Sequence, residues 1–280
     1  MRVRVLLFLL ATVLLLSCSS VPDVPARLNR ALLVAGKYNL SPFEAETQYF
    51  NLIGFSKKIT TTRPITVYVE GDGFSWVTRS VISDNPTPTI PMLLGLAGLD
   101  PKQNLIYLAR PCQYIAFEYS QKCHPHYWTS HRYSEEVVLT YMEVLDFLQR
   151  EFSTSGFHLV GYSGGGAIVA LLASRRNDVL SLRTISGNLD HVRLNAEKRV
   201  SPLTGSLNPI DFAKSLKNIP QIHFSGMKDE VVPVWVARSF VKTVGGSECV
   251  RAQSVRGASH LVGWNEVWEN LSTLIPSCKN

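Results

Sequence analysis

The sequence predicts an α/β protein in which a mostly parallel central sheet is covered by helices on both faces. From residue 65 onward, short β-branched or apolar runs alternate with longer segments whose apolar residues recur at threes and fours. One of these short runs passes through the pattern Gly-x-Ser-x-Gly at residues 161–165 directly into a helix-like run. Strands that alternate with helices along a chain pair in parallel, and the helices cover both faces of the sheet.

Residues 1–17 have the pattern of an export signal. Two arginines among the first four residues precede an uncharged apolar stretch at residues 5–16, which is shorter than the ~20 residues that cross a membrane. The end of this segment, Leu15-Leu16-Ser17-Cys18, resembles the bacterial lipobox, and this resemblance implies a lipid on Cys18. Ser19 resembles the residue that follows the cysteine in outer-membrane lipoproteins of Gram-negative bacteria. We therefore expect an exported envelope protein with a lipid anchor in the membrane; a soluble periplasmic or secreted protein is the alternative.

The rest of the chain is predicted to form one domain with a lead-in. Residues 18–60 are expected to hold the lead-in and the first sheet elements, and residues 61–280 the α/β domain. The first clear strand covers residues 65–70, which alternate and are rich in β-branched residues, and Gly71-Asp72-Gly73 breaks it. A proline-rich loop then leads to a short helix at residues 92–99.

The later elements follow from the same periodicities. A helix is expected from Ser134 to about Phe152, with Val138, Tyr141, Leu145 and Leu148 on its buried face. The other expected elements are strands at 104–109, 157–160, 180–185, 221–225 and 249–255, and helices at 167–175, 234–244 and 263–274. Residues 193–218 lack a clear period, and we expect a small cap or loop there, near the site.

The charge pattern argues against nucleic acid as a partner. The formal net charge is +6, but the basic residues are dispersed and lack the interleaved aromatic residues of nucleic-acid grooves. We interpret them as a solvated surface.

Four cysteines remain if Cys18 carries lipid. An even number in an exported chain predicts two disulfides, for which three connectivities are possible. We favour Cys112 with Cys123 and Cys249 with Cys278, because both pairs close short loops. A metal cluster of Cys112, Cys123, His124 and His126 is the rival interpretation, although its spacing matches no zinc signature.

Three residues in chain order carry the predicted chemistry. A serine hydroxyl needs a base to remove its proton and a third group to orient that base. Ser163 lies in the turn after one strand, Asp229 follows the strand at 221–225, and His260 follows the strand at 249–255. The carboxyl ends of parallel strands share one edge of a sheet, so we expect the three side chains to meet there.

Other residues compete for two of these roles. Glu230 or Asp190 could be the acid, and Asp229 could instead cap the helix that follows it. His223 precedes the acid and lies inside a predicted strand, so we expect it to pack in the sheet.

A negative charge that develops on a carbonyl oxygen needs two backbone N–H donors. The amide of Gly164, directly after the serine, is the first candidate. The second is expected from the glycine loop at residues 70–74, with Asp72 preferred over Phe74. A carboxylate beside an oxyanion would repel it, so the Asp72 side chain should point away or be paired.

Together these motifs resemble the α/β-hydrolase superfamily, over roughly residues 60–275. The resemblance rests on residues 161–165, the segment around Asp229, His260 and the glycine loop; Glu70-Gly71-Asp72-Gly73 departs from the His-Gly pattern of lipases and esterases. It implies an acyl-enzyme on Ser163 and calls for neither a metal nor an organic cofactor.

The expected function is that of a serine hydrolase, an esterase for small or medium carboxylic esters, with a small-molecule acyl compound as substrate. An acyltransferase of the same mechanism is one alternative. A non-catalytic envelope lipoprotein that uses the fold to bind a partner is the other.

Overall fold

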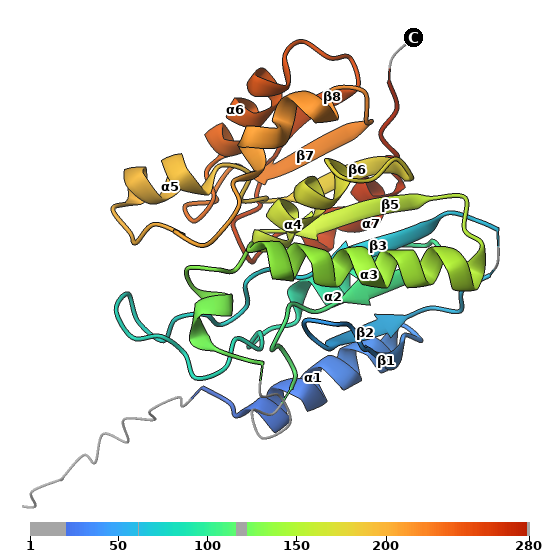
Figure 1. The fold of residues 1–280 in the computed structure, drawn as a ribbon, viewed down its shortest axis with the longest axis vertical. Helices are drawn as coiled ribbons and strands as arrows, with labels where there is room; N and C mark the ends of the chain where they lie inside the picture. Colours follow the sequence, from blue (N-terminus) through green and yellow to red (C-terminus); the bar gives the residue numbers. More distant parts are fainter. Residues whose placement is uncertain (1–20, 61, 116–121, 279–280) are drawn as a thin grey trace, which may run out of the picture.

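A computed structural model describes residues 21–60, 62–115 and 122–278, and it has one eight-stranded sheet at its centre (Figure 1). The strand order is β1-β2-β4-β3-β5-β6-β7-β8; β1 and β2 are antiparallel to their neighbours and all other pairs are parallel. The strands are β1 Ser41–Ala45, β2 Leu52–Ser56, β3 Ile65–Val69, β4 Leu105–Leu108, β5 Phe157–Tyr162, β6 Val179–Ile185, β7 Gln221–Gly226 and β8 Val250–Val255. The predicted fold class, a mostly parallel sheet with helices, is confirmed.

Helices cover both faces of this sheet. The helices are α1 Val24–Lys37, α2 Met92–Leu99, α3 Glu135–Phe152, α4 Gly164–Ala173, α5 His191–Lys198, α6 Val234–Val244 and α7 Asn265–Thr273, with 3-10 turns η2 Pro125–Trp128 and η3 Pro209–Leu216. Buried residues of α3, α4, α6 and η3 form one core cluster with the sheet, and those of α1, α2 and α7 form a second cluster. In Figure 1, α3 and α4 lie over the near face, and α2 and α7 lie behind the strands.

The central strands are buried on both faces, which explains their continuous apolar sequence. All five residues of β3 are buried. Successive residues of this strand serve different cores, since Val67 packs with α3 and α4, and Tyr68 packs with α2 and α7. The pairing of Val69 with both Leu108 and Gly161 aligns the carboxyl ends of β3, β4 and β5 at one edge.

The lead-in contains elements that the sequence did not predict individually. Helix α1 begins after Asp23, whose side chain accepts a hydrogen bond from the amide of Ala26 at 2.8 Å. Strands β1 and β2 form an antiparallel hairpin at the edge of the sheet. Turn η3 and all but the first two residues of helix α5 lie in the segment predicted as a small cap, residues 193–218.

Both predicted disulfides are present. Cys112 is bonded to Cys123 with a Cα–Cα distance of 5.6 Å, and Cys249 is bonded to Cys278. The pairing that closes the short loops is therefore confirmed, and the metal cluster built on Cys112 and Cys123 is wrong because their sulfur atoms are bonded to each other. Nowhere in the described ranges do three His, Cys, Asp or Glu side chains form a group that could hold a metal ion.

The predicted signal segment at residues 1–17 and the predicted lipid site Cys18 lie outside the described residues. Among the helices that are described, none has the length and hydrophobicity to cross a membrane.

Candidate active site

The turn between β5 and α4 holds Ser163 in an unusual backbone conformation. Its φ is 50° and its ψ is −117°, outside the regions that non-glycine residues commonly adopt. The turn is tight enough to exclude side chains on either side: a Cβ on Gly161 would lie 2.3 Å from the carbonyl oxygen of Gly165, and a Cβ on Gly165 would lie 2.0 Å from that of Val69. The two glycines of the motif therefore permit the close approach of β3, β5 and α4 that forms the turn.

The structure brings Ser163, His260 and Asp229 together. The distance from His260 Nε2 to Ser163 Oγ is 3.1 Å, and His260 Nδ1 lies 2.9 Å from Asp229 Oδ2. The Asp229 side chain is fully buried and that of His260 is 16% exposed. Tyr162, the residue before the serine, donates a hydrogen bond from its hydroxyl to the backbone carbonyl of His260 at 3.1 Å. The three side chains are thus in contact in the order serine, imidazole and carboxylate.

Asp229 is held as a carboxylate by contacts on both oxygens. Oδ1 accepts hydrogen bonds from the amides of Val231 at 2.9 Å and Val232 at 2.8 Å, and Oδ2 faces His260. Burial alone would raise the pKa of Asp229, but the contact with His260 and the backbone amide of Val232 bring this pKa below its ordinary value.

The competing acid and base candidates lie elsewhere. Asp190 caps α5 by accepting a hydrogen bond from the amide of Arg193 at 3.2 Å, and Glu230 is exposed. His223 is fully buried in β7, where its Nδ1 lies 2.9 Å from Thr184 Oγ1 and burial lowers its pKa to about 3. Among these candidates, only Asp229 and His260 contact each other or the serine.

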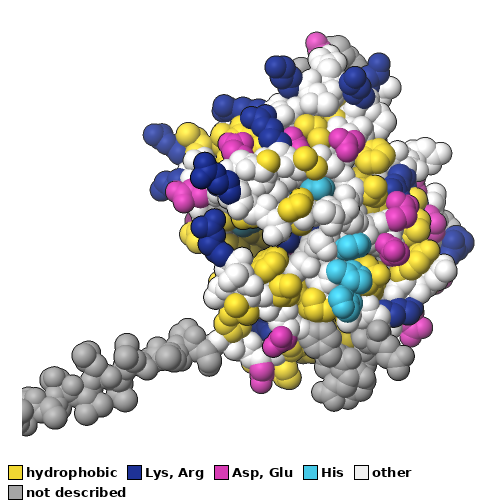
Figure 2. Space-filling model, turned by 60° about the vertical axis from the view of Figure 1, so that its left-hand side comes forward, with side chains coloured by type: hydrophobic (Ala, Val, Ile, Leu, Met, Phe, Trp, Pro, Cys, Tyr) yellow, Lys and Arg dark blue, Asp and Glu magenta, His cyan; other side chains and the backbone are white. Residues whose placement is uncertain are grey.

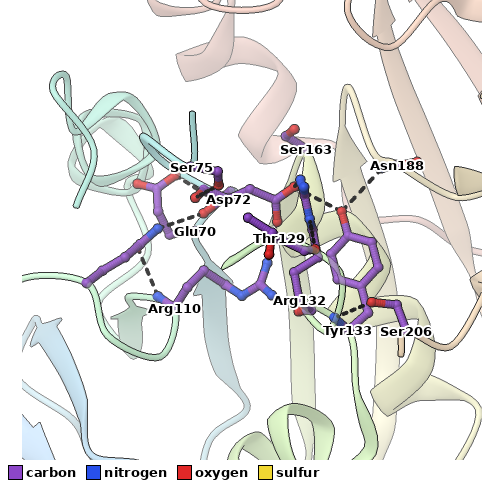
Figure 3. A network of polar contacts seen from close by, with 12 residues as sticks. Glu70, Asp72, Ser75, Arg110, Thr129, Arg132, Tyr133, Ser163, Asn188 and Ser206 are labelled. Carbon is purple, nitrogen blue, oxygen red and sulfur yellow. Dashed lines mark hydrogen bonds and ion pairs between the residues drawn. The ribbon is translucent and has the colours of Figure 1, made fainter. Parts of the chain in front are cut away.

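The carboxylate of Asp72 is paired, as its place beside the expected oxyanion requires. Oδ1 lies 3.0 Å from Arg110, Oδ2 lies 2.8 Å from Arg132, and the hydroxyl of Tyr133 donates to Oδ2 at 3.0 Å (Figure 3). Asn188 in turn donates to the Tyr133 hydroxyl at 3.2 Å. Burial would raise the pKa of Asp72, but the two guanidinium groups keep it below its ordinary value.

The amides of the glycine loop differ in their availability. The amide of Phe74 donates to the carbonyl of Pro86 at 2.9 Å, and that of Gly71 donates to Glu70 Oε1 at 2.8 Å. The amides of Asp72 and Gly164 donate to no group of the described residues. The loop and the start of α4 also touch, because a Cβ on Gly164 would lie 1.9 Å from Asp72 Oδ1. The preference for Asp72 over Phe74 as a donor agrees with this pattern, and the role of both amides stays a prediction.

Ser163 and His260 open into a cavity of about 390 Å³. Its other lining residues come from the glycine loop and the segment after it, from Pro88, Thr89 and Ile90, and from Arg132, Tyr162, Val231 and Leu261. A small ester has room to reach the serine hydroxyl there.

Sequence reasoning missed the residues that hold the glycine loop. Arg110, Arg132 and Tyr133 belong to no recognised motif in the sequence, and Glu70 was recognised only as part of the glycine loop. A signal was available for Arg110 alone, because it lies two residues after the end of β4 and so at the same sheet edge as the serine.

No protein-family model matches this chain, and the search of curated proteins found no match. Solved structures do resemble it. The Pyrococcus furiosus esterase Pf2001 superposes with a TM-score of 0.60 at 13% identity, over 85% of this chain and 91% of that one. Est1E from Butyrivibrio proteoclasticus has a TM-score of 0.57 at 13% identity, over 82% and 95%. An alpha-beta serine hydrolase homologue from Coxiella burnetii has a TM-score of 0.53 at 16% identity, over 84% and 94%. With its strand order and its strand–turn–helix at Ser163, this chain therefore has the α/β-hydrolase fold.

Proposed function

We propose that this protein is a serine hydrolase that cleaves carboxylic esters through an acyl-enzyme on Ser163. The observation that carries the proposal is the line of contacts from Asp229 through His260 to Ser163, at 2.9 and 3.1 Å. Both distances are within hydrogen-bonding range, so proton transfer requires no rearrangement of these side chains.

The mechanism follows from the orientation of the imidazole. When Nδ1–H of His260 donates to Asp229, the lone pair of Nε2 faces Ser163 Oγ and accepts the hydroxyl proton as Oγ attacks the ester carbon. The imidazolium is stabilised by the buried carboxylate of Asp229. It then gives the proton to the departing alkoxide, which leaves an acyl group on Ser163.

The second half-reaction repeats these steps with water. His260 removes a proton from water, the hydroxide attacks the acyl carbon, and the carboxylic acid leaves as Ser163 Oγ regains its proton. The amides of Gly164 and Asp72 would stabilise the oxyanion in both halves.

The test uses a fluorophosphonate probe and a p-nitrophenyl ester with three proteins: wild type, Ser163→Ala and Asp229→Asn. We expect wild type to be labelled and active, and Ser163→Ala to be neither. Asp229→Asn keeps an oxygen for the amides of Val231 and Val232 but favours the wrong tautomer of His260, so kcat should fall by about 10³–10⁴ while the fold is kept.

The outcomes separate the rival functions. Equal labelling of wild type and Ser163→Ala would reject the mechanism. An acyltransferase is distinguished by an added alcohol that competes with water for the acyl group, and a binding protein by the lack of both labelling and turnover.

A further inference from the structure

A second and larger cavity adjoins the one that contains Ser163. Its volume is about 1340 Å³, against about 390 Å³ for the serine cavity. Trp76, Arg132 and Val231 line both cavities, so the two cavities adjoin at these residues. A substrate whose ester group lies at Ser163 can extend past Arg132 into the larger space, which we call the side cavity.

Three segments form most of the side cavity. Residues 76–79 follow the glycine loop, residues 129–132 follow η2, and residues 195–203 comprise the end of α5 and the turn after it. The last segment belongs to the predicted small cap. The cap therefore contributes a wall beside the candidate site.

The side cavity is positively charged. Arg79, Arg132, Lys198 and Arg199 line it, and no Asp or Glu is among its described lining residues. Figure 2 shows Lys and Arg side chains around a hollow on this face of the molecule. The ammonium group of Lys198 donates to the backbone carbonyl of Glu230, a neutral group that leaves its charge in place. Clustered charges of one sign in a cleft concentrate the field there and attract an anion.

The excess of positive charge continues to the boundary with the serine cavity. The single carboxylate of Asp72 is shared by Arg110 and Arg132, so these three side chains together carry one positive charge. The side chain of Arg132 is 15% exposed, and it is part of the wall of both cavities. An anion in the side cavity would therefore meet a cation close to the ester as well as three at its walls.

Apolar groups lie between these charges. Val77, Val200 and Val231 are 50%, 47% and 56% exposed, and Pro202 and Leu203 also line the side cavity. Such side chains favour contact with carbon atoms of a bound molecule. The walls thus suit a compound with a short carbon chain that ends in an anionic group.

We propose that the side cavity selects esters that carry an anionic group, such as a carboxylate, at the end of a short carbon chain. This inference rests on the proposed ester hydrolysis at Ser163. It assigns Arg79, Lys198 and Arg199 as specificity-determining residues that contact the anionic end of the substrate and not the reacting atoms.

The experiment compares matched esters in which one remote carboxyl group is either free or methylated. Mono-p-nitrophenyl glutarate and its neutral methyl ester place the charge on the acyl side, and 4-carboxyphenyl butyrate and its methyl ester place it on the alcohol side. We expect wild type to prefer the anionic member of at least one pair by on the order of tenfold in kcat/KM at low salt, and less at high salt.

Two triple variants distinguish the effect of the charges in the side cavity from the effect of the protein's net charge. Arg79→Gln/Lys198→Gln/Arg199→Gln should abolish the preference and leave kcat/KM for the neutral esters unchanged. The matched control Lys214→Gln/Lys217→Gln/Lys242→Gln removes three exposed cations that do not line the side cavity, and the preference should remain.

The inference is overturned if wild type prefers the anionic ester in neither pair, or if the two triple variants behave alike. In that case Ser163-dependent labelling and hydrolysis of the neutral esters would still support the proposed function. Failure of wild type to hydrolyse any of the four esters, without labelling of Ser163, would overturn both.

Discussion

Two carboxylates in the glycine loop, Glu70 and Asp72, have opposite environments although one residue separates them. Burial raises the pKa of Glu70 to about 7, and the hydrogen bonds from the Gly71 amide and the Tyr107 hydroxyl only partly oppose this effect. Two arginines overcome the same effect at Asp72 and lower its pKa. Glu70 therefore titrates near neutral pH beneath the loop, and Asp72 remains a carboxylate.

Replacement of Glu70 by glutamine should change how stability depends on pH. The pKa of Glu70 rises from an ordinary value of 4.5 in the unfolded chain to about 7 in the folded one. The folded state therefore binds the proton of Glu70 more tightly than the unfolded state does. The contribution of protonated Glu70 to the free energy of unfolding is complete below pH 4.5 and is lost as the pH rises through 7. Glu70→Gln lacks this loss, so its free energy of unfolding relative to wild type should increase by up to about 3 kcal/mol between pH 4.5 and 8.

Urea denaturation at several pH values measures this difference. Parallel stability curves for wild type and Glu70→Gln would show that the carboxyl group does not titrate with a raised pKa in the folded protein.

At the scale of the element, the start of helix α4 has a low helix propensity, and the same residues allow its backbone to approach β3 and β5 closely. Helix α4 begins with three glycines, which are poor helix formers, and every later residue in it is buried. Packing of this apolar helix against β3, β5 and β6 stabilises it in place of propensity. The glycines let the backbones approach closely enough to hold Ser163 at the sheet edge.

Two glycine-to-alanine substitutions should have effects of opposite sign. In Gly165→Ala the new Cβ would lie 2.0 Å from the backbone carbonyl oxygen of Val69, and neither backbone can move aside easily, so we expect a loss of about 3 kcal/mol or more. A Cβ on Gly95, in helix α2, would meet no atom within 4 Å, and Gly95→Ala should stabilise the protein by about 1 kcal/mol. Chemical denaturation measures both effects, and equal stability of the two variants would contradict the account of the turn.

At the scale of the whole molecule, the features that could be predicted from the sequence are those marked by a pattern of neighbouring residues. The expected elements from residue 65 onward are present because their apolar periods report burial directly. The meeting of Ser163, Asp229 and His260 could be predicted because each follows a parallel strand, and these strands end at one edge. Strand β1 was missed as a strand because it lies at the sheet edge, contains a proline and has only partly buried or exposed residues.

The pairing of Asp72 had no such signal. Its partners Arg110, Arg132 and Tyr133 lie 38, 60 and 61 positions away along the chain. The tertiary fold brings these segments together, and neither a hydrophobic period nor a sequence motif predicts the contact. Only the need for some partner could be predicted, from the repulsion between a carboxylate and an oxyanion.

The two disulfides connect different parts of the molecule. Cys112–Cys123 closes a loop of sequence separation 11 that begins two residues after Arg110, on the side of the sheet that holds Ser163. Cys249–Cys278 has a sequence separation of 29 and joins the residue before β8 to the C-terminal segment, at the opposite edge of the sheet. They should therefore stabilise the fold alike and influence the candidate site differently.

Removal of each disulfide in turn tests this difference. Cys112→Ala/Cys123→Ala and Cys249→Ala/Cys278→Ala should each lower the free energy of unfolding by about 3 kcal/mol, because the entropy gained by the unfolded chain depends only weakly on loop length. The first variant also loosens the segment that carries Arg110, which holds Asp72 at 3.0 Å, so kcat/KM for a neutral ester should fall on the order of tenfold or more. The second should keep wild-type kcat/KM at a temperature where both variants are folded. Equal loss of activity in the two variants, measured under those conditions, would show that the Cys112–Cys123 loop has no special part in positioning Asp72.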